Sequence, residues 1–222
     1  MSILKIGIIG AGNIGGALTH LFTKAGHEVE VANSRGPNSL EALAKATGAK
    51  AQDIDAVVKD KDVIVVTIPL KNVPQIAAVV SSNAPSQAII IDTCNYYPKQ
   101  RDGRIGPIEE GLPESRWVEL QLGRPVIKVF NTIYAAHLLE HGRPRGDGGR
   151  IALPLAGDDG AQKAKVVQLL DQIGFDAVDV GGIDESWRQQ PGTPAYGADL
   201  DQAHLSLALA EASPARGSDW MA

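Results

Sequence analysis

One glycine-rich segment near the start of the chain restricts the possible folds more than any other feature of the sequence. Residues 10–15 read Gly-Ala-Gly-Asn-Ile-Gly, which is a G-x-G-x-x-G pattern. The pattern directly follows an apolar run at residues 3–9, which is typical of a strand buried on both faces. Apolar residues at helical spacing come directly after it and end at Gly26. A strand, a glycine loop and a helix in this order predict the first unit of a dinucleotide-binding sheet.

The spacing of the glycines indicates a chemical role for each position of the loop. Gly10 permits a tight turn, Gly12 lets the backbone approach a pyrophosphate, and Gly15 lets the helix pack close to the strand. Amides at the start of the helix, which include those of Asn13 and Ile14, can then hold the phosphates. We therefore predict that these five residues bind a dinucleotide. The alternative is a glycine-rich turn without a ligand.

The end of the second expected strand, residues 28–32, indicates which dinucleotide is bound. A site that prefers NAD places Asp or Glu here, about 20 residues after the glycines, to bond the ribose hydroxyls. This chain has Asn33, Ser34 and Arg35 instead. The guanidinium of Arg35 can pair with a 2′-phosphate and stack on adenine, while the Ser34 hydroxyl donates a further hydrogen bond. We predict that these three residues bind NADP; the alternative is that Arg35 is only a solvated loop charge.

Short β-branched runs alternate with helical patterns along the rest of the chain. The expected strands are residues 3–9, 28–32, 62–67, 88–92, 126–130, 151–156 and 177–180, and the expected helices are residues 14–25, 39–47, 73–80, 134–140, 161–173 and 199–212. This alternation predicts an α/β fold, a Rossmann-type doubly wound parallel sheet with a smaller C-terminal α/β domain. We place the NADP-binding domain in residues 1–124 and the smaller domain in residues 125–222. Residues 93–124 and 181–197 are expected to be irregular.

The composition argues against several other classes of protein. Of the 222 residues, 44% are hydrophobic and 21% are charged, which is typical of a globular chain. The net charge is −5 and no basic block is present, so we expect no binding to nucleic acid. No apolar run approaches the ~20 residues of a membrane span, and the first residues do not resemble a signal peptide. The single cysteine, Cys94, excludes an internal disulfide. We expect a cytoplasmic protein that does not bind membranes.

Polar residues follow three of the expected strands, at the edge of the sheet where ligands of open α/β folds bind. Near the nicotinamide we predict cofactor contacts from the ends of these strands and substrate contacts from the residues beside them. The predicted cofactor residues are Thr67, Ile68, Pro69, Asn95 and Asn131, and the predicted substrate residues are Tyr96 and Thr132. The alternatives are a strand-ending proline at residue 69, a turn-forming Asn beside a packing Tyr at 95–96, and helix capping at 131–132.

The remaining reactive side chains provide no metal site in the sequence. His137 and His141 are four residues apart and share a helix face, but no Glu follows His137 and no third ligand is evident nearby. We therefore predict no bound metal, and we expect His137 to contact the substrate. Cys94 has no neighbour that would lower the pKa of its thiol, so we expect an inert small residue.

Four segments of the chain resemble a known family. They are residues 10–15, Ala32-Asn33-Ser34-Arg35, residues 126–133 (VIKVFNTI) and residues 155–159 (LAGDD). Together they resemble the NADPH-dependent F420 reductase family, and the reductase domains of the STEAP metalloreductases share the same elements. The resemblance implies a Rossmann domain followed by a smaller α/β domain, with hydride moved between NADP and a flavin-like partner in a cleft between them. It also implies a homodimer.

The sequence therefore favours an enzyme, an NADP-dependent oxidoreductase that uses F420, FMN, FAD or a similar planar acceptor. The alternatives are a non-catalytic NADPH sensor and a reductase of a small imine or carbonyl. The last of these would need a positioned proton donor, which the sequence does not indicate, so the catalytic residues stay unassigned. We also predict that the apolar stripe of Leu205, Ala208, Leu209 and Ala212 contributes to a homodimer interface.

Overall fold

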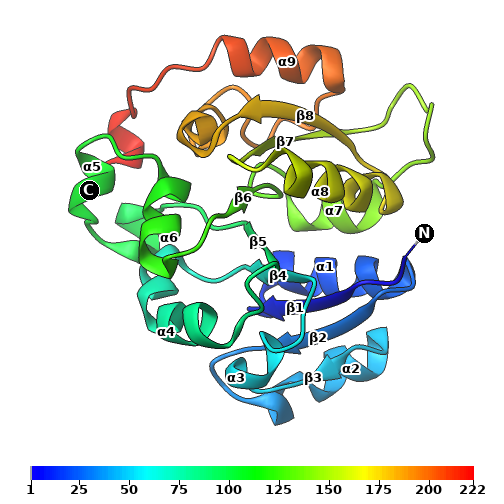
Figure 1. The fold of residues 1–222 in the computed structure, drawn as a ribbon. Coiled ribbons are helices and arrows are strands. Elements are labelled where there is room, and N and C mark those ends of the chain that lie inside the picture. Colours follow the sequence, from blue (N-terminus) through cyan, green and yellow to red (C-terminus); the bar gives the residue numbers. More distant parts are fainter. Residues whose placement is uncertain (1) are drawn as a thin grey trace.

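The computed structural model describes residues 2–222 and contains one mixed sheet of eight strands (Figure 1). The strands are β1 (Lys5–Ile9), β2 (Glu28–Ala32), β3 (Lys50–Ala51), β4 (Val63–Val66), β5 (Ile89–Asp92), β6 (Ile127–Lys128), β7 (Ala152–Ala156) and β8 (Asp176–Gly181). Their order in the sheet is β3-β2-β1-β4-β5-β6-β7-β8. All neighbouring strands are parallel except β6 and β7, which pair antiparallel. The predicted doubly wound α/β fold is confirmed.

Helices cover both faces of this sheet. The α-helices are α1 (Asn13–Lys24), α2 (Glu41–Thr47), α3 (Ile54–Val57), α4 (Val73–Asn83), α5 (Gly106–Glu109), α6 (Glu114–Leu122), α7 (Ala135–Glu140), α8 (Gly160–Gln172) and α9 (Gln202–Ala210). Alternation along β1 sends Ile6 and Ile8 into the core beneath α1, α7 and α8, and sends Ile9 into the core beneath α3, α4 and α6. Strands buried on both faces explain the continuous apolar runs in the sequence.

The segment between β5 and β6 is more regular than the sequence indicates. Residues 93–124 contain α5 and α6, so the prediction of an irregular segment is wrong. Helix α6 buries only Trp117, Val118 and Leu122 as apolar residues, and its first turn buries Glu114 and Ser115. The buried face of α6 is partly polar, and its polar side chains find partners elsewhere in the fold. The apolar periodicity of this segment is therefore weak in the sequence.

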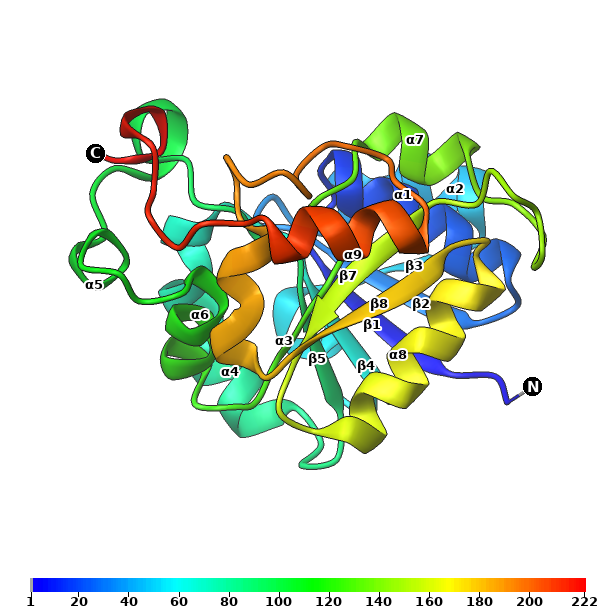
Figure 2. The ribbon, with the colours of Figure 1, turned by 90° about the horizontal axis from the view of Figure 1, so that it is seen from above.

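Helix α9 packs on its own chain. Its residues Leu205, Ala208 and Leu209 are buried in a small core with Ala152 of β7, and Val178 and Val180 of β8 pack against that core. Figure 2 shows α9 lying along these two strands. Ala212 lies beyond the end of the helix. The stripe therefore has a partner within the monomer, and the predicted dimer no longer follows from it.

Two further observations concern the whole chain. Strands β6 to β8 continue the sheet that β1 begins, and the division into domains at residue 124 stays a prediction. Within residues 2–222, no helix has the length and apolar character needed to cross a membrane.

Candidate active site

The glycine loop has the geometry that the spacing predicts. Gly10 has φ +111°, a conformation that side-chain-bearing residues rarely adopt, and its amide donates to the Ala32 carbonyl at 2.8 Å. A Cβ on Gly15 would collide with the Gly10 carbonyl, so only glycine permits this approach of α1 to the loop. A Cβ on Gly12 would meet nothing within 4 Å among the described residues. The space beside Gly12 is therefore open to a ligand at the start of α1.

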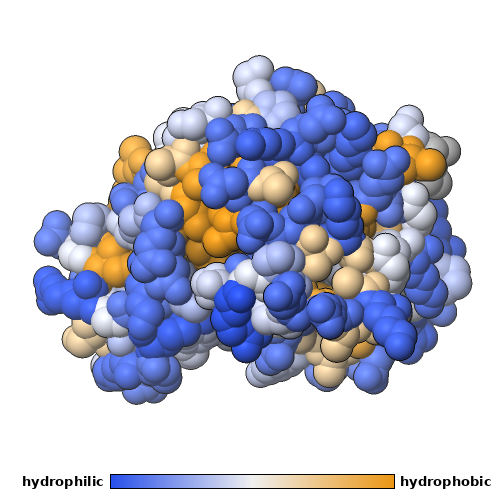
Figure 3. Space-filling model, turned by 90° about the horizontal axis from the view of Figure 1, so that it is seen from below, coloured by the Kyte–Doolittle hydropathy of each residue, from blue (hydrophilic) through white to orange (hydrophobic). Residues whose placement is uncertain are grey.

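The first cavity lies between this loop and the ends of β2 and β4. Its lining comprises Ile9, Gly10, Ala11, Gly12, Asn33, Ser34, Arg35, Ile54, Thr67, Ile68, Pro69, Asn72, Gln75 and Ile76. Ser34 and Arg35 are exposed at this cavity. The α3 and α4 side of the molecule, seen from below in Figure 3, is mostly hydrophilic around an apolar area. An apolar wall with a cationic rim suits an adenosine that carries a phosphate.

Asn33 has a different local task from its two neighbours. Its Oδ1 accepts a hydrogen bond from the Arg35 amide at 2.9 Å, and its Nδ2 donates to the Ser39 hydroxyl at 2.9 Å. An Asn that bonds the backbone two residues ahead forms a tight turn. Asn33 therefore holds the turn that presents Ser34 and Arg35 to the cavity.

A second cavity, of about 470 Å³, adjoins the first at Gly12 and at residues 67–69. Its volume is within the range of small-molecule sites in proteins. Its lining comprises Gly12, Asn13, Ile14, Thr67, Ile68, Pro69, Thr93, Cys94, Asn95, Tyr97, Arg101, Phe130, Asn131, Ile133, Tyr134, Ala135 and Tyr196. The two cavities thus meet across the predicted pyrophosphate position, as the two halves of a dinucleotide require.

Asn95 and Asn131 hold each other at the floor of the second cavity. Asn95 Nδ2 donates to the Asn131 carbonyl at 2.9 Å, and Asn131 Nδ2 donates to Asn95 Oδ1 at 3.1 Å. Gln189 Nε2 donates to Asn131 Oδ1 at 2.9 Å and to the Pro154 carbonyl at 3.1 Å. These bonds fix both Asn side chains, while their contact with nicotinamide stays a prediction. Sequence reasoning missed Gln189, which reaches the pair from 58 residues away.

The sequence predicts that the strand at residues 126–130 includes Phe130. The strand instead ends at Lys128, and Phe130 has φ +67°, which is unusual for a bulky residue. Its ring is buried, and the residue lines the second cavity. Backbone strain of this kind is concentrated at binding sites.

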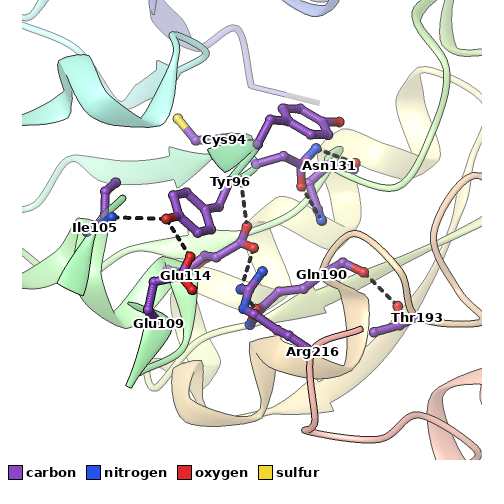
Figure 4. Close-up of polar contacts among 12 residues, drawn as sticks. Cys94, Tyr96, Ile105, Glu109, Glu114, Asn131, Gln190, Thr193 and Arg216 are labelled. Carbon is purple, nitrogen blue, oxygen red and sulfur yellow. Dashed lines mark hydrogen bonds and ion pairs between the residues drawn. The ribbon is translucent and has the colours of Figure 1, made fainter. Parts of the chain in front are cut away.

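Tyr96 lies outside the second cavity, and Tyr97 lines it instead. Tyr96 is fully buried; its hydroxyl donates to Glu109 at 2.7 Å and accepts from the Ile105 amide at 2.9 Å (Figure 4). Burial raises the pKa of this hydroxyl to about 12. Successive side chains of an extended segment point to opposite sides, so only one of the two tyrosines faces the cavity. The position of Tyr96 gives no support to a substrate contact.

Tyr196 joins Tyr97 in the cavity wall, although 99 residues separate them in sequence. The two hydroxyls are hydrogen-bonded to each other. Burial, together with the hydrogen bond with Tyr97, raises the pKa of the Tyr196 hydroxyl well above its usual value. This hydroxyl therefore stays protonated at neutral pH. The sequence contains no local signal for this pairing.

The other predicted substrate residues, Thr132 and His137, do not line the second cavity. Thr132 is buried, and its carbonyl accepts from the Gly197 amide at 2.7 Å. His137 lies outside, in contact with His141 and Asp199. The sequence showed no third ligand for the histidine pair, and the fold brings Asp199 there.

A buried ion pair contacts Cys94, which lines the second cavity. Lys128 Nζ lies 3.1 Å from Asp92 Oδ2 and also donates to the Cys94 carbonyl, and neither charged side chain is exposed. Asp92 accepts further hydrogen bonds from the Cys94 amide at 2.8 Å and the Ser115 hydroxyl at 2.7 Å. Burial raises the pKa of the Cys94 thiol well above its usual range, which is consistent with the expected inert cysteine.

Comparison with known proteins places this geometry in a family. Residues 5–96 match the family described as NADP oxidoreductase, coenzyme F420-dependent. Protein YjhV of Escherichia coli (strain K12) is 42% identical over 81 residues, which are 36% of this chain and 59% of YjhV. Hypothetical protein SMa0349 of Sinorhizobium meliloti is 30% identical, with TM-score 0.76, over 90% of this chain and 95% of that one. A protein of Arthrobacter sp. FB24, provisionally named an F420-dependent NADP reductase, is 21% identical, with TM-score 0.67, over 81% and 86% of the two chains.

The sheet and the paired cavities are those of a dinucleotide-binding α/β fold, and the comparisons place the chain among NADP-dependent oxidoreductases. Residues 5–96 match the family of coenzyme F420-dependent NADP oxidoreductases, and nearly the whole chain is similar to protein SMa0349. The resemblance found in the sequence is thereby confirmed for this family. The similarity to STEAP metalloreductases stays a prediction.

Proposed function

We propose that this protein transfers hydride between NADP(H) and a flavin-like planar acceptor such as F420, FMN or FAD. The observation that carries the proposal is the second cavity. It meets the dinucleotide cavity at Gly12 and at residues 67–69, and its lining includes the aromatic residues Tyr97, Tyr134 and Tyr196. Aromatic walls favour a planar ring, and hydride transfer needs two rings held face to face with little help from acids or bases.

The preference for NADP(H) rests on Ser34 and Arg35. Both are exposed at the first cavity, where the turn held by Asn33 presents them. A carboxylate would repel the 2′-phosphate of NADP(H), because both groups are negatively charged. This turn has a guanidinium where NAD-binding sites have the carboxylate. When the cofactor is bound, its nicotinamide would supply the hydride. The fixed amides of Asn95 and Asn131 would orient that ring.

A second candidate reaction is the reduction of a small imine or carbonyl, and the Tyr97–Tyr196 pair favours it. Such a reaction needs a proton as well as a hydride, and the sequence offered no donor. The Tyr196 residue lines the cavity, and its hydroxyl can recover a donated proton through its hydrogen bond with Tyr97.

One assay distinguishes these functions. NADPH oxidation is followed with F420, FMN, FAD, a cyclic imine and a small aldehyde, using the wild type and the Tyr196→Phe variant. Turnover of a flavin-like acceptor that is insensitive to Tyr196→Phe supports the first proposal. Turnover of the imine or aldehyde that falls at least about a hundredfold in Tyr196→Phe, the size of a general-acid contribution, supports the second. Tight NADPH binding without turnover of any acceptor would instead support the sensor.

We also propose a homodimer, which the resemblance to the family implies. The outward side of α9 remains available for it, since Leu207 is 62% exposed there.

A further inference from the structure

Three potential metal ligands meet outside the second cavity. His137 lies on α7, His141 is the C-cap residue one turn later, and Asp199 lies in the segment just before α9. One ligand atom from each residue lies within 4.8 Å of those from the other two. The two imidazole rings stack with centroids 4.6 Å apart, and His137 Nδ1 contacts the Asp199 carboxylate. We call these three residues the His–Asp cluster.

Two polar atoms of the His–Asp cluster are buried and make no hydrogen bond to the described residues. Among residues 2–222, neither His137 Nδ1 nor Asp199 Oδ1 has a hydrogen-bond partner. The contact between His137 Nδ1 and Asp199 Oδ2 is close in distance but lacks hydrogen-bond geometry. Buried polar atoms nearly always have a partner, so two such atoms side by side need an explanation. A cation bound between them would accept both lone pairs.

The backbone holds Asp199 in place for this contact. Asp199 has φ +44°, in the left-handed region that few non-glycine residues occupy. Two backbone hydrogen bonds fix the segment on either side, from the Gly197 amide to the Thr132 carbonyl at 2.7 Å and from the Ala152 amide to the Leu200 carbonyl at 2.8 Å. The carboxylate is therefore presented to α7 by a strained and anchored segment, which is typical of a site with a specific task.

We propose that the His–Asp cluster binds a divalent transition-metal ion of the zinc class, which goes beyond the proposed hydride transfer. Two imidazoles and one carboxylate form a ligand set that zinc accepts, and three protein ligands leave a position for water. Zinc bonds of about 2.0–2.1 Å place tetrahedral ligand atoms about 3.3 Å apart, so small side-chain rotations suffice to complete the site.

The bound ion would act as a clip between distant parts of the chain. It joins α7 to the segment that carries Tyr196, and Tyr196 and Tyr134 both line the second cavity. The Tyr134 ring already packs edge-on against His137, with centroids 5.5 Å apart. Closing the connection between residues 137 and 199 stabilises the folded chain and holds one wall of the cavity.

The test is a zinc titration of the full-length, tag-free protein after treatment with a chelator. Zn²⁺ is added in competition with a chromophoric chelator to the wild type and to His141→Ala. His141 is exposed, so its removal leaves the core intact. The matched control is His204→Ala, because His204 also pairs with an aspartate, Asp201 at 2.8 Å, but lies outside the His–Asp cluster.

We expect one equivalent of Zn²⁺ to bind to the wild type and to His204→Ala. His141→Ala should bind Zn²⁺ at least about tenfold more weakly, because loss of a ligand costs no less than loss of an outer-shell partner. Zn²⁺ should raise the Tm of the wild type and of His204→Ala but not that of His141→Ala. No saturable binding to the wild type, or equal binding to His141→Ala, would overturn the proposal.

Discussion

At the scale of single residues, the loop and the turn after β2 carry the cofactor chemistry. Gly12 leaves open space where a side chain would stand, and Arg35 is exposed at the rim of the first cavity. Neither residue contributes to the apolar core. Substitution at these positions therefore tests binding separately from folding.

Arg35→Ala should reduce the preference for NADPH over NADH by about tenfold or more. A charge-assisted hydrogen bond contributes about 1.5–3 kcal/mol, and only NADPH has the 2′-phosphate that receives it. Calorimetry with both cofactors checks this. Arg104→Ala is the control, since Arg104 is also exposed but lines neither cavity. An unchanged ratio of the two dissociation constants in Arg35→Ala would show that Arg35 does not bind the 2′-phosphate.

Gly12→Val should abolish NADPH binding while the protein stays folded. The Cβ finds no clash within the described chain, so the side chain fills only the space that a pyrophosphate needs. Gly16→Val is a matched control, since Gly16 is one helical turn further along, has equally open surroundings and lines neither cavity. Fluorescence titration together with circular dichroism measures both properties. Retained affinity in a folded Gly12→Val variant would place the phosphates elsewhere.

At the scale of elements, polar pairs join segments that the sequence separates widely. Arg216, beyond α9, donates to Glu114 at the start of α6 with a distance of 2.6 Å, and also donates to Gln190 (Figure 4). Glu114 is fully buried, and burial raises the pKa of its carboxyl although Arg216 opposes the rise. The terminal segment is thereby attached to the helix that the sequence analysis missed.

Arg216→Ala should destabilise the fold by about 3 kcal/mol or more at neutral pH, because it leaves a buried carboxylate without its cation. The pKa of Glu114 should then rise further. When folding raises the pKa of an acid, the ionised acid lowers the free energy of unfolding at pH values above the folded pKa. At pH values below the unfolded pKa the acid is protonated in both states, and this loss disappears. The loss of stability should therefore shrink as the pH falls through the raised pKa.

Urea unfolding over a series of pH values measures this effect. Lys5→Ala is the control, because the Lys5–Asp60 pair is exposed and screened by solvent. A difference between the wild type and Arg216→Ala that stays constant with pH would mean that Glu114 is not its source.

At the scale of the whole molecule, the question is how α9 relates to a second copy of the chain. Its apolar stripe is occupied by β7 and β8, so removal of residues from Leu200 onward would expose a core and not only an interface. A substitution on the outward side of the helix is the cleaner test.

Leu207→Asp should convert the proposed dimer to a monomer without unfolding it. The Leu207 side chain is 62% exposed on α9, and a buried charge at an interface is costly. Leu120→Asp on α6 is the matched control, because Leu120 is also 62% exposed. Light scattering at micromolar concentration reports the mass. A monomeric wild type, or a dimer that persists in Leu207→Asp, would show that α9 makes no interface.

The sequence alone determined the strand, glycine loop and helix at residues 3–25, the position of residues 33–35 after the second strand, and most of the sheet. These features depend on residues that are neighbours in the chain, so spacing and side-chain type suffice to predict them. Only the tertiary structure decided which of Tyr96 and Tyr97 faces the cavity, that Tyr196 and Gln189 complete it, and that Asp199 reaches the two histidines. It also decided what covers the stripe of α9. Each of these contacts joins residues that are far apart in the sequence and are brought together by packing. A local sequence pattern does not indicate which distant segment will pack against it.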